Sequence, residues 1–126
     1  MSNIQRSTLF GKLNSFLYKS IEGATVFCKM RGNPYVELVH WLKQVLEAQD
    51  SDLNRIAQHF GLDPSRLAAD VTNSLESLPR GATSISDFSP HIEDSVERSW
   101  VYATLQFGNG SFVRAFLSME FWRLLV

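Results

Sequence analysis

The side chains that could carry out chemistry are few in this sequence, and they are scattered. The three histidines, His40, His59 and His91, lack the His-Glu-x-x-His spacing that places two imidazoles and a base around a zinc ion. The single cysteine, Cys28, has no second thiol for a disulfide or a metal cluster. We therefore expect a partly buried packing role for His40 and a buried, inert thiol at Cys28. The sequence predicts no catalytic residue, no metal site and no cofactor.

Phosphate chemistry and nucleic-acid binding are also disfavoured. The sequence has no Gly-x-x-x-x-Gly-Lys-Ser/Thr loop, the motif whose backbone amides hold phosphates in ATPases. Twelve Lys and Arg residues oppose thirteen Asp and Glu residues, so the formal net charge is -1 and no global positive field attracts a polyphosphate. The acidic run Glu93, Asp94 and Glu97 beside Arg98 indicates a solvated helix face. This chain is therefore not expected to be an enzyme.

The beginning of the chain and its apolar runs bear on its location. The first ten residues, MSNIQRSTLF, lack a basic region followed by a long apolar run. No stretch reaches the roughly 20 apolar residues that cross a bilayer. A lone cysteine suits a reducing compartment. We expect a cytoplasmic protein that does not engage a membrane.

Apolar residues recur every three to four positions along most of the chain, which predicts helices. The predicted helices cover residues 9–31, 34–46, 52–60, 63–78, 90–106 and 112–125, with a polar, turn-prone linker at 80–89. No alternating run of β-branched residues is present, so almost no sheet is expected. A chain of 126 residues with 44% hydrophobic residues is long enough to bury one core. The sequence therefore predicts one all-α domain.

The breaks between the predicted helices contain residues that favour helix ends. Gly32 is expected to take the left-handed conformation that ends the first helix. Asn33 is expected to cap the second helix, with Pro34 as its first residue. At Gly23 the apolar period slips, which leaves either a kink or burial on two sides of the helix open.

Two stretches of the sequence repeat the same order of features. GNPYVELVHWLKQVL begins at Gly32, and the looser GNGSFVRAFLSMEFWRLL begins at Gly108, an offset of 108 - 32 = 76 residues. Each follows a long predicted helix and carries an aromatic residue near its middle. A fixed offset of this length indicates a duplicated supersecondary unit, of which the second copy is incomplete.

The motifs VELVHWL, LDPSRL and LPRGATSISDFS, taken together with the Gly-Asn-Pro break, resemble the N-terminal domain of the Clp/Hsp100 AAA+ unfoldases. The resemblance is closest to their type VI secretion branch, ClpV, and covers residues 9–107. It implies a Clp N-terminal-like helical bundle in which two four-helix units form a pseudo-twofold pair. Residues 1–126 would then be one domain, with repeat one at 9–79, the linker at 80–89 and a partial repeat two at 90–126. The residues after Gly108 depart from the family pattern, so self-association through that apolar end is expected.

The resemblance also implies a function and a set of contact residues. Domains of this branch capture a helix of the small subunit of the contractile sheath, so that an AAA+ ring can disassemble and recycle the sheath. Binding would place an amphipathic helix in a groove, and the ring would supply ATP hydrolysis. The surplus of apolar residues in the first helix suggests where this groove lies. The expected peptide-binding residues are Leu9, Phe10, Leu13, Phe16, Leu17, Phe88 and Ile92. The alternative is that these residues only pack the two repeats together.

A helix-turn-helix DNA-binding regulator is the competing interpretation, because residues 52–76 have the right spacing of two helices around a Gly-containing turn. DNA recognition, however, needs cations for phosphates and donors for bases. Between Asp50 and Arg80 there are three Arg residues and five acidic residues, a net charge of 3 - 5 = -2. The charge balance disfavours this alternative.

Overall fold

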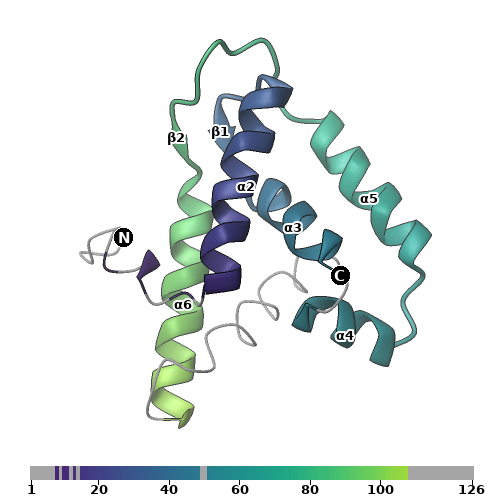
Figure 1. Ribbon diagram of the computed structural model, residues 1–126, viewed down its shortest axis with the longest axis vertical. Coiled ribbons are helices and arrows are strands. Elements are labelled where there is room, and N and C mark those ends of the chain that lie inside the picture. The colour runs from purple at the N-terminus through teal and green to yellow at the C-terminus, as the bar shows by residue number, and fades with distance from the viewer. Residues whose placement is uncertain (1–7, 9, 12, 14, 49–50, 108–126) are drawn as a thin grey trace.

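The computed structural model describes residues 8, 10–11, 13, 15–48 and 51–107. In chain order its elements are α2 (Ser15–Arg31), β1 (Tyr35–Val36), α3 (Leu38–Glu47), α4 (Asp52–His59), α5 (Pro64–Glu76), β2 (Asp87–Phe88) and α6 (Pro90–Phe107). In Figure 1, α3 lies between α2 and α5. The regular secondary structure of the described residues is helical apart from two strands of two residues each, which confirms the all-α prediction. The helix predicted at 112–125 lies outside the described residues.

The first long helix is shorter than predicted. Gly11 lies in a turn and Leu13 in a bend, so the regular helix begins at Ser15 rather than at residue 9. From there α2 continues through Gly23 as a single helix. A Cβ at Gly23 would come within 2.7 Å of Oε1 of Gln44. The side chain of Gln44 would have to move to make room for it. The unbroken helix argues against a kink, and burial on two sides is also not found, because Val26 is 60% exposed and the buried residues of α2 lie on one face.

The helix α2 ends where predicted, but the next helix begins later than predicted. Gly32 has the left-handed conformation, with φ of 70°. The prediction that Asn33 caps the next helix is wrong, because its buried side chain bonds to His40 instead. Residues 35–36 form β1, and α3 begins at Leu38 with Glu37 as its N-cap. Long-range contacts have overridden the local preference of an Asn-Pro pair to start a helix.

The two short strands connect this break to the segment before α6. Tyr35 pairs with Asp87 and Val36 with Phe88 in parallel register, and α3, α4 and α5 form the connection between the strands. Three backbone hydrogen bonds continue the pairing outward: the amides of Ala82, Ser86 and Ser89 donate to the carbonyls of Gly32, Pro34 and Val36 at 2.8–2.9 Å. The predicted linker at 80–89 is therefore held along residues 32–36.

The remaining helix starts follow local sequence signals. Ser51 accepts a hydrogen bond from the amide of Asn54 at the start of α4. The carboxylate of Asp63 accepts one from the amide of Ser65 at the start of α5. Pro90 begins α6 at the predicted residue. A polar N-cap side chain satisfies an amide that has no partner within the helix, so these boundaries are fixed by short stretches of sequence.

The core is centred on α3, and α2, α4, α5 and α6 all contribute buried side chains to it. Its largest fully buried side chain is Trp41 of α3, whose indole Nε1 donates to the hydroxyl of Ser20 at 2.7 Å. From α6, Ile92 and Val96 enter the same cluster with no exposed surface. In the part of the chain that the structure describes, no helix is both long enough and apolar enough to cross a membrane.

Candidate peptide-docking site

The predicted docking residues lie largely in the core. Leu9 lies outside the described residues. Four of the others are at most 9% exposed: Phe10, Leu13, Leu17 and Ile92. Phe88 is half-buried against this cluster, whereas Phe16 is 36% exposed. The structure therefore brings five of the predicted residues into one apolar cluster, and Phe16 is the described member that stays exposed.

A ring contact links the two parts of this site. Phe10 meets Phe88 edge to face, with ring centroids 5.6 Å apart and an interplanar angle of 87°. The contact joins the segment before α2 to the strand before α6. This is the kind of contact expected if the predicted residues pack parts of the domain together instead of binding a peptide. Phe16 and the exposed part of Phe88 are the members of the described set that solvent reaches most.

A buried polar network, which the sequence did not reveal, positions the start of α3. The amide of Glu37 donates to Nδ1 of His40 at 2.8 Å, so that nitrogen carries no proton. Nε2 then donates to Oδ1 of Asn33 at 2.9 Å, and Nδ2 of Asn33 donates to the carbonyl of Pro79 at 2.7 Å. His40 and Asn33 are at most 1% exposed. Their partner Pro79 is remote in sequence, so spacing alone could not identify the network.

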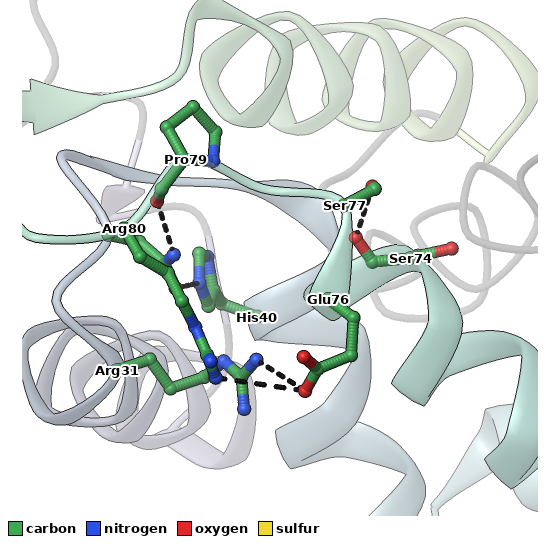
Figure 2. Close-up of polar contacts among 8 residues, drawn as sticks. Arg31, His40, Ser74, Glu76, Ser77, Pro79 and Arg80 are labelled. Carbon is green, nitrogen blue, oxygen red and sulfur yellow. Dashed lines mark hydrogen bonds and ion pairs between the residues drawn. The ribbon is translucent and has the colours of Figure 1, made fainter.

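Two arginines extend this junction toward the surface. Figure 2 shows the guanidinium groups of Arg31 and Arg80 reaching the carboxylate of Glu76, at 3.1 and 3.7 Å. Arg31 also lies over the ring of Phe27, 5.7 Å from its centroid. Glu76 is 54% exposed, so solvent screens both ion pairs and each adds little to stability. Only the pair from Arg31 links the end of α2 to the end of α5, because Arg80 lies four residues after Glu76 in the chain.

The environment of Cys28 agrees with the predicted inert thiol. It is fully buried, and its Sγ lies 3.3 Å from the carbonyl oxygens of Asn33 and Tyr35. Burial, and after it the negative charge of Glu37, raises the pKa of the thiol. Among the described residues, no group of three or more His, Cys, Asp and Glu side chains is placed to hold a metal ion.

We expect alkylation of Cys28 by iodoacetamide to be at least about a hundredfold slower in the folded chain than in concentrated guanidinium chloride, because only the exposed thiolate reacts. Met30→Cys provides the matched control, since Met30 is 80% exposed on the same helix. Mass spectrometry would count the modified thiols over time. Equal rates at the two positions under native conditions would contradict the buried placement of Cys28.

Comparison with known proteins gives close relatives. The AAA+ ATPase ClpV1 of Pseudomonas aeruginosa is 63% identical over 108 residues, which cover 86% of this chain and 12% of that protein. A structure solved in work on the coevolution of the ATPase ClpV, the TssB-TssC sheath and the accessory HsiE protein is 60% identical. It has a TM-score of 0.85, and the match covers 93% of this chain and 72% of that one. No family model matches the chain.

A third match has a more distant sequence. A ClpV N-domain solved in complex with a VipB peptide is 22% identical, with a TM-score of 0.81, and the match covers 94% of this chain and 72% of that one. At this identity the likeness concerns the fold. Together with the helical architecture, the matches define the class of protein, a helical N-terminal domain of a Clp-type ATPase.

Within that class, the chain belongs to the ClpV family. The matched part of the chain spans only 12% of the length of the AAA+ ATPase ClpV1. The helices α4 and α5 do follow one another within residues 52–76, but these matches give no support to a helix-turn-helix regulator.

Proposed function

We propose that this chain is the substrate-recognition domain of a type VI secretion unfoldase and that it docks a helix from a subunit of the contractile sheath. The observation that carries the proposal is the 63% identity to ClpV1 over 86% of the chain. The shared fold with a ClpV N-domain that was solved with a VipB peptide supports peptide binding as the activity. The domain itself performs no catalysis. Where it is part of a longer protein, an AAA+ ring hydrolyses ATP in the cytoplasm to recycle the sheath.

The docking surface that we propose is the outer rim of the predicted cluster. It comprises Phe16 on the flank of α2 and the exposed part of Phe88 beside the start of α6. Leu9 belongs to the proposal, and Phe10, Leu13, Leu17 and Ile92 support the rim from within. An amphipathic helix would place its apolar side chains between α2 and α6. A large aromatic side chain at the centre of such a surface commonly dominates the binding energy.

The first experiment is a fluorescence-anisotropy titration with labelled N-terminal helices of both sheath subunits. Sequence resemblance favours the small subunit, and the paired titration decides between the two. We expect saturable binding of one peptide and about tenfold weaker binding by Phe16→Ala, because the anchor side chain is lost.

Tyr18→Ala is the matched control, since Tyr18 is a 46% exposed aromatic residue on the same helix. Its affinity is expected to stay within about twofold of the unmodified chain, as for most surface contacts outside an anchor. Circular dichroism would establish that both variants are folded. If neither sheath helix binds the folded chain, the proposed function does not hold. If Tyr18→Ala weakens binding as much as Phe16→Ala, the function stands and the docking surface is misplaced.

Self-association through residues 108–126 remains part of the proposal. Sedimentation velocity over a range of concentrations would test it. A monomer at every concentration would contradict it.

A further inference from the structure

The helix α5 packs against α3 but buries few of its own side chains. Of its 13 residues, only Val71 and Leu75 are buried. Its neighbour α3 buries His40, Trp41, Leu42 and Val45 within ten residues. A hollow of about 690 Å³ lies between the two helices, within the range typical of ligand-binding clefts.

The floor of this hollow is apolar and comes from both helices. Leu38, Val39 and Leu42 line it from α3, and Val71 and Leu78 line it from α5 and the residues that follow. We call this surface the α3–α5 groove. Leu38, Val39 and Leu78 are half-buried, so part of the floor faces solvent. The floor residues of α3 recur at helical spacing, as in a groove that receives another helix.

The rim of the groove is negatively charged. Among the residues that the structure describes, Glu37 and Asp70 are the only charged ones that line it, and the other titratable side chain is the exposed imidazole of His91 at the start of α6. Beyond Val71 a second hollow of about 410 Å³ continues toward α4. There Lys43 and Glu47 pair at 3.3 Å and offset one another. The described charged residues that line the two hollows, Lys43 against Glu37, Glu47 and Asp70, therefore sum to 1 - 3 = -2.

We propose that the α3–α5 groove docks a positively charged amphipathic helix of a protein partner, separately from the sheath helix. Apolar side chains spaced three and four residues apart would occupy the floor, and Lys or Arg side chains would lie beside Glu37 and Asp70. The ten residues of α3 span about 15 Å, which matches roughly three turns of a docked helix. Complementary charge across such a surface selects the partner and accelerates its association.

The groove is distinct from the surface proposed for the sheath helix. None of the described docking residues lines it. Charge-reversing variants in the groove can therefore be tested without altering Phe16 or Phe88. This inference goes beyond the proposed function, and the two can fail independently.

The probe is a fluorescein-labelled synthetic helix of about 14 residues, or about 21 Å, with a leucine face flanked by lysines. A second peptide has glutamate in place of each lysine. Anisotropy titrations compare the unmodified full chain with two variants. Asp70→Lys reverses a charge in the groove, and Glu22→Lys is the matched charge reversal at an exposed position of α2. We expect the lysine peptide to bind and the glutamate peptide to bind at least about tenfold more weakly. Asp70→Lys should weaken the lysine peptide about fivefold to tenfold, and Glu22→Lys less than twofold.

Amide chemical shifts of the isotope-labelled chain would locate the bound peptide. Shifts confined to α3 and α5 support the proposal, as does the absence of competition by whichever sheath helix binds. Equal binding of the two peptides, no binding of the lysine peptide, or equal effects of the two charge reversals would overturn it. Displacement of the lysine peptide by a sheath helix would also overturn it, because the groove would then be the sheath site.

Discussion

Trp41→Ala is expected to lower the free energy of unfolding by about 3–5 kcal/mol, the largest effect of any single substitution that we predict. The indole of Trp41 has no exposed surface and belongs to the core, to which all five described helices contribute side chains. Its removal leaves a large cavity and takes away the Nε1 donor that lies 2.7 Å from the hydroxyl of Ser20. Because small domains are commonly stable by only about 5–15 kcal/mol, this variant should be partly unfolded at moderate temperature.

Urea unfolding followed by circular dichroism would measure the change. Met30→Ala is the control for loss of a large apolar side chain, since Met30 is 80% exposed, and it should change stability by less than about 0.5 kcal/mol. Trp41→Phe should fall between the two, because it keeps most of the ring and loses the donor. A midpoint for Trp41→Ala equal to that of Met30→Ala would show that α3 does not hold the centre of the fold.

The sequence predicted those parts of the fold that depend on local chemistry. The starts at Ser51, Asp63 and Pro90 follow from side chains or ring geometry within a few residues, and the structure has them. The start of α3 was misplaced because Asn33 bonds to His40 and Pro79, and no local rule describes a partner 46 residues away. Propensity is a weak prior where a long-range network competes with it.

The predicted docking residues show the same limit of prediction from local sequence. Helical spacing predicted correctly that Leu13, Leu17 and Ile92 face apolar surroundings, but periodicity cannot tell whether that face meets the domain's own core or another protein. The groove between α3 and α5 was not predicted at all. It arises because α5 is held by few buried residues, which depends on how the helices pack rather than on any one segment.

His40→Ala is expected to lower the free energy of unfolding by about 2–4 kcal/mol. The substitution removes a buried imidazole that packs edge to face with Phe27, at a centroid distance of 6.0 Å. It also takes away the acceptor of the Glu37 amide and the donor to Asn33. Buried polar groups that lose their partners cost about 1–3 kcal/mol each, in addition to the cavity. Urea unfolding at pH 7.5 would measure the loss, and His59→Ala on an exposed imidazole should be nearly neutral.

The same network makes stability depend on pH. Burial lowers the pKa of His40. The negative charge of Glu37 and a backbone hydrogen bond with Glu37 oppose this shift, and the positive charge of Arg31 adds to it. Protonation would also put a hydrogen on Nδ1, where the amide of Glu37 already donates. The folded chain therefore binds fewer protons at His40 than the unfolded chain, whose pKa is about 6.5. The stabilisation is fully present above about pH 6.5 and is lost as the pH falls from there toward the lowered pKa of the folded state.

Urea midpoints between pH 7.5 and 5 would reveal this dependence in comparison with His40→Gln, which cannot titrate at this position. We expect the difference in unfolding free energy between the two chains to shrink with acidification, by at most about 1.4 kcal/mol per pH unit, the limit for one proton. His59→Gln should retain the pH dependence of the unmodified chain, because the exposed His59 takes no part in the network. Parallel stability curves for the unmodified chain and His40→Gln would mean that the imidazole titrates alike in the folded and unfolded states. The hydrogen bonds from Glu37 and to Asn33 would then not hold it in its neutral form.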